Sequence, residues 1–225
     1  MNDLILEIDP VLEPRRVRAA LIWGLGLPSC APSSAPQAWL AELLARVAAA
    51  GDAFLPAGRK AAVRDMLRHG SYKPAGRAKP SSEYLLSAAL AGDFPLVNAP
   101  VDANNAASLE YGYPASIFDL AATGPRLRLS RGAPGEAYVF NPSGQTIELE
   151  DLLLVRREAG GAWEACGNPV KDAMATKVFE SARNVVGVVY APAAEPPADL
   201  EACAARFAEL LARGAGAAET GFRIV

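Results

Sequence analysis

The stretch NVVGVVYAP, at residues 184–192, constrains the fold more than any other part of this sequence. Its side chains are continuously apolar and rich in valine, whose branched side chain favours an extended strand. A half-buried strand alternates apolar and polar residues, whereas an unbroken apolar run is typical of a strand covered on both sides. We therefore predict that residues 184–192 form a strand buried on both faces.

The remaining pattern mixes helices and strands without strict alternation, which predicts an α+β fold. The chain has 225 residues, of which 51% are hydrophobic, enough for a sizeable core. Residues 197–214 form the clearest amphipathic helix. We predict further helices at 38–51, 58–70, Ser81 or Ser82 to Gly92, and Asp102 to Gly112, with loops at 28–36 and 160–175. We predict strands at 3–7, 15–25, 94–102, 115–120, 126–130, 136–141, 152–155 and 220–225, with a hairpin over 140–149.

Composition and charge exclude several classes of protein. The formal net charge is −3, which argues against a protein that coats nucleic acid non-specifically, and we expect no DNA partner. The three cysteines are far apart and lack zinc or redox spacing, so we expect free thiols that are buried or half-buried. The first residues lack a basic region before the apolar ones, and no apolar run is long enough to cross a bilayer. These features predict a soluble, cytoplasmic protein without a signal peptide, metal or other cofactor.

Positive charge is concentrated in one segment. Between residues 59 and 79 there is one acidic residue, Asp65, and seven basic ones: Arg59, Lys60, Arg64, Arg68, Lys73, Arg77 and Lys79. The last three lie on a loop whose prolines and glycine restrict the backbone, which lowers the cost of presenting charge to one anionic target. The alternative is a solvated helix face and a loop that forms salt bridges with Glu83 or other acids.

Two polar clusters complete the candidate residues. Asn98, Asp102, Asn104, Asn105 and Ser108 lie between apolar elements, and asparagine can both donate to and accept from a small ligand. Their alternative role is helix capping. The segment 168–177 carries Lys171, Asp172, Thr176 and Lys177 just before the central strand, where loops often hold ligands; an ordinary ion pair on a surface loop is the alternative. The single histidine, His69, is expected to lie at a helix C-terminus as a favourable cation.

These clusters, in this order, resemble one family. Residues 95–120 are similar to the signature of the B3/B4 domain of the phenylalanyl-tRNA synthetase β subunit, approximately V-D-x-T-N-x-x-x-L-E-x-G-x-P-x-H-x-F-D. The resemblance continues through 126–155 and ends in RNVVGVVYA, while KPAGRAKPSSEY, at 73–84, is more similar to free-standing B3/B4 proteins. It covers about residues 10–214.

The resemblance implies a B3/B4-like mixed sheet flanked by helices, formed by residues 1–225 as a single domain. Within it we expect an N-terminal lobe at about 1–92 and a signature lobe at about 93–225. In the synthetase this domain edits: it hydrolyses the ester of tyrosine wrongly attached to tRNA. The resemblance therefore implies an RNA-binding deacylase that acts on the 3′ end of a mischarged aminoacyl-tRNA. The chain has no aminoacylation motifs, so it is not a synthetase by itself.

The sequence departs from the family pattern at three positions. The family's asparagine falls on Asn105, but its threonine becomes Asn104, its histidine becomes Ser116, and its acidic residue on the last strand becomes Val188. The resemblance thus implies a substrate other than tyrosine or a site rebuilt from other residues. The first replacements to consider are Lys171, Asp172, Thr176, Arg77 and Glu83.

The resulting hypothesis gives each candidate a role. Asn105 orients the ester, Asp172 or Glu83 orients the attacking water, and the basic loop holds the terminal phosphates. The substrate-binding set is Lys73, Arg77, Lys79, Asn98, Asn104, Ser108, Ser116, Lys171 and Thr176. Two alternatives remain: a module that binds tRNA, an amino acid or a small metabolite without chemistry, and an accessory protein that docks on a larger enzyme.

Overall fold

The computed structural model describes residues 3–12 and 16–225, and its centre is a four-stranded sheet. The predicted buried strand is β9 (Asn184–Pro192), which lies between β2 (Val17–Leu25) and β3 (Ala115–Asp119). β10 (Glu219–Ile224) pairs with the other side of β2, and all three pairings are antiparallel. Every residue of β9 after the first is buried, so the prediction from the valine run is confirmed. Among the described strands, none pairs with the other edge of β3.

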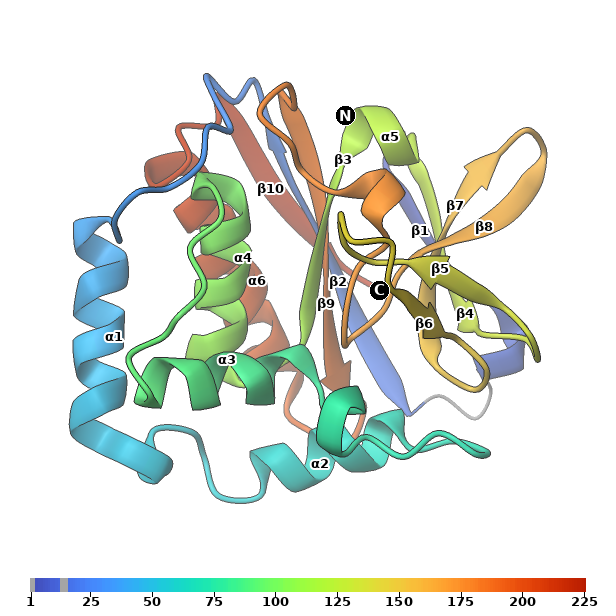
Figure 1. Cartoon of the computed structure of the whole chain (residues 1–225), viewed down its shortest axis with the longest axis horizontal. Helices are drawn as coiled ribbons and strands as arrows, with labels where there is room; N and C mark the ends of the chain where they lie inside the picture. Colours follow the sequence, from blue (N-terminus) through green and yellow to red (C-terminus); the bar gives the residue numbers. More distant parts are fainter. Residues whose placement is uncertain (1–2, 13–15) are drawn as a thin grey trace.

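Helices cover one face of this sheet in two layers (Figure 1). α4 (Ala99–Tyr111) and α6 (Pro197–Arg213) pack directly on the strands, while α1 (Ala38–Ala50) and α3 (Ser81–Leu90) lie outside them against α4. α2 (Arg59–Leu67) passes below the sheet and contacts β9. The helix predicted at 197–214 is confirmed, because the apolar stripe of α6 is what closes this face.

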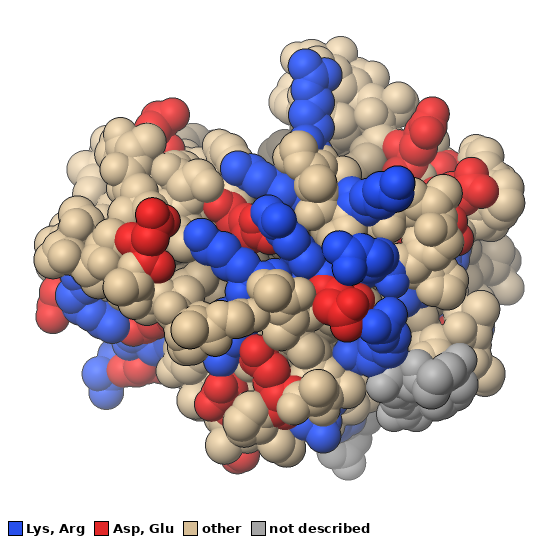
Figure 2. All heavy atoms as spheres, turned by 90° about the horizontal axis from the view of Figure 1, so that it is seen from below, with Lys and Arg blue, Asp and Glu red and all other residues tan. Residues whose placement is uncertain are grey.

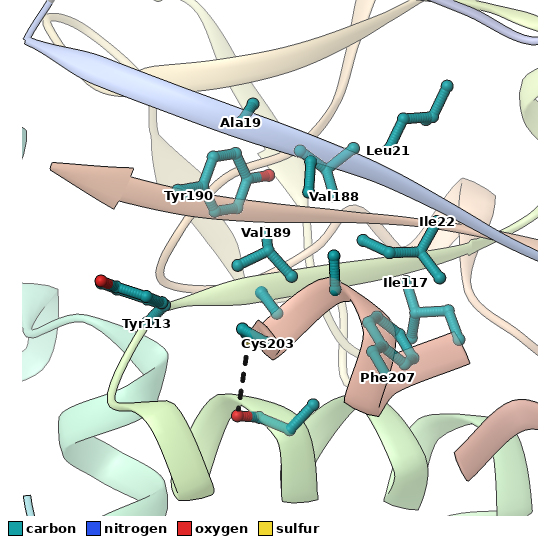
Figure 3. Close-up of a cluster of buried hydrophobic side chains, with 14 of the residues drawn as sticks. Ala19, Leu21, Ile22, Tyr113, Ile117, Val188, Val189, Tyr190, Cys203 and Phe207 are labelled. Atoms are coloured by element: carbon teal, nitrogen blue, oxygen red, sulfur yellow. Dashed lines mark hydrogen bonds between the residues drawn. The ribbon is translucent and has the colours of Figure 1, made fainter. Parts of the chain in front are cut away.

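The core shows why the valine run contains a glycine. Val189 points towards the helices, whereas Val188 and Tyr190 point to the other side of the sheet (Figure 3). The Phe207 ring of α6 packs over Gly187, where a Cβ atom would lie 2.7 Å from Phe207 Cε1. A larger residue at 187 would therefore push α6 off the sheet.

A second four-stranded sheet stands beside the first, in the order β1 (Ile5–Ile8), β4 (Arg126–Arg131), β7 (Leu153–Ala159), β8 (Ala162–Gly167). β1 runs parallel to β4 and the other pairs are antiparallel. The predicted hairpin is also present, formed by β5 (Ala137–Val139) and β6 (Thr146–Glu148). The described residues also form a short helix, α5 (Leu120–Thr123), and four 3-10 helices: η1 (Pro10–Leu12), η2 (Gly51–Ala53), η3 (Gly76–Ala78) and η4 (Met174–Thr176). The α+β class is confirmed.

Several predicted boundaries were wrong. The strand predicted at 94–102 does not form, because helix α4 already begins at Ala99 with Asn98, not Asp102, as its N-cap. The loop predicted at 160–175 contains β8, which pairs with β7 and is reached through the turn at Gly160 and Gly161. α2 ends at Leu67 rather than at Gly70, since the backbone becomes extended at Arg68. Of the strand predicted at 15–25, residue 15 lies outside the described residues.

Three further observations bear on the predictions. Cys30, Cys166 and Cys203 are free and buried, as expected. No helix in the described part of the chain is long and apolar enough to cross a membrane. β2, from the proposed N-terminal lobe, pairs with β9 and β10 of the proposed signature lobe, and the division into lobes stays a prediction.

Candidate functional site

A cavity of about 240 Å³ opens where α3, α4, the free edge of β3 and the segment 168–178 meet. Its walls are largely apolar, and its polar residues come from three of these four elements. Chains often place ligand contacts on loops held by a rigid scaffold, and here the sheet and two helices form that scaffold. The cavity is lined by Ser81, Tyr84, Leu85, Pro95, Val97, Val101, Asn104, Asn105, Ala115, Ile117, Asn168, Val170, Lys171, Asp172, Lys177 and Val178.

Three of the lining residues carry a buried polar atom that has no hydrogen-bond partner among the described residues. These atoms are Ser81 Oγ on α3, Asn104 Oδ1 on α4 and Asp172 Oδ1 on the loop. Buried polar groups in native proteins nearly always have a partner, and an unpaired one costs about 1–3 kcal/mol. Because three such atoms belong to residues that line one cavity, this cavity is the candidate functional site.

Asp172 is the acidic residue of the cavity. Its Oδ2 accepts a hydrogen bond from the Ile117 amide on the free edge of β3, at 3.3 Å. A Cβ atom at Gly167 would lie 2.6 Å from Asp172 Oδ1, so the glycine makes room for the carboxylate. Burial raises the pKa of Asp172 to about 7, against the opposing effects of the Ser116 hydroxyl, the Ile117 amide and the Lys177 charge. A carboxyl group that is half-ionised near neutral pH suits a general base.

The turn before Asp172 is held by a dense set of hydrogen bonds. Asn168 Oδ1 accepts from the amides of Val170 and Lys171, at 2.8 and 2.9 Å. Its Nδ2 donates to Tyr138 Oη, which in turn donates to the Lys171 carbonyl, each at 2.6 Å. These bonds fix the loop to the β5–β6 hairpin, so Asp172 and Lys171 are presented by a rigid turn.

Asn104 and Asn105 come from consecutive positions of α4, both facing the cavity. Asn104 Nδ2 donates to Asn105 Oδ1 at 3.2 Å, which fixes the orientation of the Asn105 amide. Its own Oδ1 is one of the three unpaired atoms. The pair therefore offers one acceptor, from Asn104, and one NH₂ donor, from Asn105, to a molecule in the cavity.

Ser116 lies beneath the cavity rather than in it. The residue is fully buried, and its hydroxyl lies 2.9 Å from Tyr190 Oη on β9. It is directly opposite Val188 in the β3–β9 ladder, so two of the positions at which the sequence departs from the B3/B4 pattern form a single cross-strand pair. The Ser116 hydroxyl lowers the pKa of Asp172, which makes it a supporting residue of the site.

Four other predicted residues do not line the cavity. Glu83 is buried and forms a bidentate ion pair with Arg64, with Arg64 Nε to Glu83 Oε1 at 2.6 Å. Asn98 caps α4 and donates to the Val178 carbonyl. Ser108 donates to the Tyr113 carbonyl, and Thr176 donates to the Cys166 carbonyl. All four residues stabilise the scaffold, and for Asn98 and Ser108 a structural role was the alternative given from sequence.

The basic segment divides into a structural part and an exposed part. Arg59 is buried between Glu195 and Asp199, Arg64 pairs with Glu83, and Arg68 lies 3.8 Å from Asp65. In the described part of the chain Lys73, Arg77 and Lys79 form no ion pair, so the loop does not salt-bridge to Glu83. Figure 2, which views the side of α2 and this loop, shows Lys and Arg side chains gathered across the middle of the face.

The structure adds residues that the sequence did not single out. Ser81 was one of two serines expected to cap a helix, yet the N-cap of α3 is Pro80, and Ser81 lines the cavity with a buried hydroxyl that has no partner among the described residues. Tyr84, one turn later at the cavity wall, is 50% exposed. The spacing of Ser81, Tyr84 and Leu85 on one helix face was the available signal. Among the described residues, no group of three or more His, Cys, Asp or Glu side chains is placed to hold a metal ion.

Comparison with known proteins identifies a protein family and similar solved structures. The sequence matches the protein family described as "B3/4 domain" over residues 73–194, which include every residue that lines the cavity. A search of curated proteins finds no match. Among solved structures, the chain is similar to an N-terminal fragment of the phenylalanyl-tRNA synthetase beta subunit from Pyrococcus horikoshii, at 11% sequence identity and a TM-score of 0.49. The match covers 97% of this chain and 50% of that fragment, so the chain spans about half the fragment's length.

Proposed function

This chain belongs to the B3/4 domain family, and on that premise we propose that it hydrolyses the ester bond of mischarged aminoacyl-tRNA. The observation that carries the proposal is the group of three unpaired polar atoms around one cavity within the family segment. The resemblance of residues 95–120 to the B3/B4 editing signature names the substrate class. A cytoplasmic location follows from that substrate.

In this proposal the cavity holds the aminoacyl group. Its α-ammonium carries three N–H donors, and Asn104 Oδ1 and Ser81 Oγ are acceptors that lack a donor. The amino-acid side chain contacts the apolar wall formed by Leu85, Val97, Val101, Ile117, Val170 and Val178. Because this wall is apolar and the family's histidine and acid are Ser116 and Val188 here, the proposed substrate carries an apolar side chain rather than tyrosine.

The chemistry requires one base and one oxyanion donor. The Asp172 carboxylate accepts a proton from the attacking water as the water oxygen bonds to the ester carbonyl carbon. The Asn105 NH₂ group donates to the carbonyl oxygen as negative charge develops on it. When the intermediate collapses, the C–O bond to the ribose breaks and the proton passes from Asp172 to the ribose oxygen. The products are a free amino acid and an uncharged tRNA.

Of the two carboxylates considered from sequence, the proposal retains Asp172 alone. Glu83 is engaged by Arg64 through both of its oxygens and does not line the cavity. Both of its oxygens already accept hydrogen bonds from the guanidinium, so the proposal does not use Glu83 to orient a water molecule.

A panel of charged tRNAs tests the proposal. The protein is incubated with each correctly and wrongly charged tRNA, and the remaining ester is measured over time. Faster loss of one or a few esters than in buffer, weakened in Asn105→Ala, is the expected result. If no ester in the full panel is lost faster than in buffer, the proposal fails.

A second candidate, binding without hydrolysis, is favoured by the Ser116–Val188 pair, because two polar groups of the editing pattern are missing there. A thermal-shift screen with free amino acids and with tRNA distinguishes this candidate. A pure amino-acid binder is stabilised by its ligand and unaffected by tRNA, and it leaves every ester in the panel intact.

A further inference from the structure

Strand β10 lies at the end of the central sheet that is opposite to the candidate site. In the order β10-β2-β9-β3, the cavity lies beside β3 at one end, and β10 lies at the other. Among the described strands, none pairs with the side of β10 that faces away from β2. An edge of this kind presents amides and carbonyls that can pair with a strand of another chain.

The backbone groups that point outward from β10 follow from its pairing with β2. The Val225 amide donates to the Ala19 carbonyl at 2.8 Å, and the Ala19 amide donates to the Val225 carbonyl at 3.2 Å. In an antiparallel ladder, successive residues direct their backbone groups to opposite sides of the strand. The amides and carbonyls of Thr220, Phe222 and Ile224 therefore face away from β2. β10 contains neither proline nor lysine, which natural edge strands use to prevent further pairing.

The sequence of β10 is complementary to itself when two copies run antiparallel. With Gly221 of one copy opposite Gly221 of the other, Glu219 lies opposite Arg223 at both ends of the pairing. In this register the outward groups of Thr220 and Phe222 bond to each other, and Glu219 and Arg223 form the non-hydrogen-bonded pairs, whose side chains are closest. A shift of two residues in either direction places Gly221 opposite one of the charges and removes both ion pairs.

Both charged side chains are available for this pairing. In the described part of the chain neither takes part in an ion pair, and the Arg223 guanidinium donates only to the Leu4 carbonyl. Arg223 lies opposite Leu21, which lies opposite Val188, and Val188 points away from the helices (Figure 3). The charges of β10 therefore lie on the face of the sheet that α6 does not cover.

Helix α6 lies at a distance from this edge that lets two copies of the helix pack together. It packs on both β2 and β10, so it runs over the boundary between these strands. Neighbouring strands are about 4.8 Å apart, so in a continuous sheet each α6 lies about one such spacing from the two-fold axis. The two helices then lie about 10 Å apart, within the distance at which helices pack directly.

The side of α6 that would face the second copy carries mainly small residues. On the opposite side, Cys203 donates to the Ala107 carbonyl and Arg206 pairs with Glu110, both on α4. At 3.6 residues per turn, the side turned away from these contacts is formed by Glu201, Ala205, Ala208 and Ala212. Alanine side chains allow two helices to approach closely.

We propose that two copies of this chain pair through β10, so that their four-stranded sheets become one continuous sheet and their α6 helices pack across the two-fold axis. The interface combines main-chain hydrogen bonds, reciprocal Glu219–Arg223 ion pairs and a contact between alanine side chains. Such an interface is closed, because the same surface of each copy is used once. The two cavities lie at the outer ends of the joined sheet, so the inference is independent of the proposed function.

Sedimentation velocity of the whole chain over a range of concentrations tests the proposal. The unaltered protein is expected to form a reversible dimer. Glu219→Arg sets arginine opposite arginine, and Arg223→Glu sets glutamate opposite glutamate, so each change is expected to raise the dimer Kd about tenfold or more. The double variant restores opposite charges and is expected to dimerise with a Kd within about threefold of the unaltered value.

The double variant also separates charge from local structure. Arg223→Glu loses the hydrogen bond to the Leu4 carbonyl, and the double variant lacks that bond too. Recovery of the dimer in the double variant can therefore come only from the restored charge pairs.

Three other variants complete the test. Thr220→Pro removes an outward amide without touching the ladder to β2, and Ala205→Arg places a long side chain between the two helices; each is expected to raise the dimer Kd about tenfold or more. Arg68→Glu is the matched control, because it reverses a charge on a 60% exposed side chain just after α2. Its dimer Kd is expected to stay within about twofold of the unaltered value.

Three results would overturn the inference. The first is a chain that stays monomeric at every concentration up to its solubility limit. The second is a dimer whose Kd is unchanged in both single charge reversals. The third is a double variant that dimerises no better than the single variants. Ester hydrolysis is measured separately, and its absence would remove the proposed function without affecting any of these results.

Discussion

Replacing Asp172 with asparagine removes a charge from the cavity while keeping the shape of the side chain. The ordinary pKa of 3.8 rises to about 7 at this position, chiefly through burial. Each pH unit of that rise corresponds to about 1.4 kcal/mol, so ionisation of Asp172 lowers the free energy of unfolding by about 4 kcal/mol at most. Water that enters the cavity reduces this figure to about 2–4 kcal/mol.

The sign of the pH dependence follows from the direction of the shift. Asp172 has a higher pKa in the folded state, so below pH 3.8 it is protonated in both states and does not destabilise the fold. As the pH rises from 3.8 towards 7, the unfolded state ionises first and the free energy of unfolding falls. Asparagine does not titrate. The difference between Asp172→Asn and the unaltered protein should therefore grow by about 2–3 kcal/mol between about pH 5 and about pH 8, with the variant more stable at the higher pH.

Urea unfolding of both proteins at the two pH values measures this difference directly. Glu7→Gln, on β1, is the control, because hydrogen bonds from Arg128 and Arg126 lower the pKa of Glu7. That carboxylate is ionised throughout the range from about pH 5 to about pH 8, so the effect of its replacement should not vary with pH. A constant difference for Asp172→Asn over the same range would refute the assignment of a raised pKa to the cavity carboxyl.

Three further substitutions test the packing and the site. Arg59→Ala should lower the free energy of unfolding by about 3–5 kcal/mol, because it removes the buried cation that pairs with Glu195 and Asp199 and that lies 4.2 Å from the Tyr113 ring. A loss below about 1 kcal/mol in urea unfolding would contradict this. Asn104→Ala should change the free energy of unfolding by less than about 1 kcal/mol, since Asn104 Oδ1 is already unpaired. It should lower kcat/KM for the hydrolysed ester about tenfold or more. A larger loss of stability with normal kcat/KM would show that the role of Asn104 is structural. Val188→Glu should lower Tm sharply because it buries a carboxylate in a fully enclosed position, and an unchanged Tm would show that this position has access to solvent.

The elements that sequence predicted well are those whose pattern follows from burial alone. β9 and α6 have strong apolar periodicity and were identified at nearly their observed limits. The start of α4 was placed too late, because Asn98 and Asp102 are both good caps. Pro100 held the missing signal, since proline is favoured in the first helical turn and therefore indicates that Asn98 is the cap. β8 was missed although Gly160 and Gly161 form the kind of turn that joins two strands.

The types of residue that form the site could be predicted from sequence, but the contacts that decide the role of each residue could not. Asparagine and aspartate between apolar elements indicated Asn104, Asn105 and Asp172, which line one cavity in the structure. Sequence could not decide between Asp172 and Glu83, because the choice depends on Arg64, which is distant in sequence from both. In the same way, the role of Ser81 depends on where residues 168–178 pack, and no local sequence pattern predicts that packing.

Deacylation by two matched carboxamide variants tests the central claim, that the cavity carboxyl and not the buried ion pair performs the chemistry. Asp172→Asn and Glu83→Gln are compared with the unaltered protein on the aminoacyl-tRNA that the panel identifies, near pH 8 and well below the unfolding temperature. The predicted result is a loss of about 100-fold or more in Asp172→Asn and a rate near that of the unaltered protein in Glu83→Gln. A normal rate in Asp172→Asn, or a loss confined to Glu83→Gln, would contradict the account.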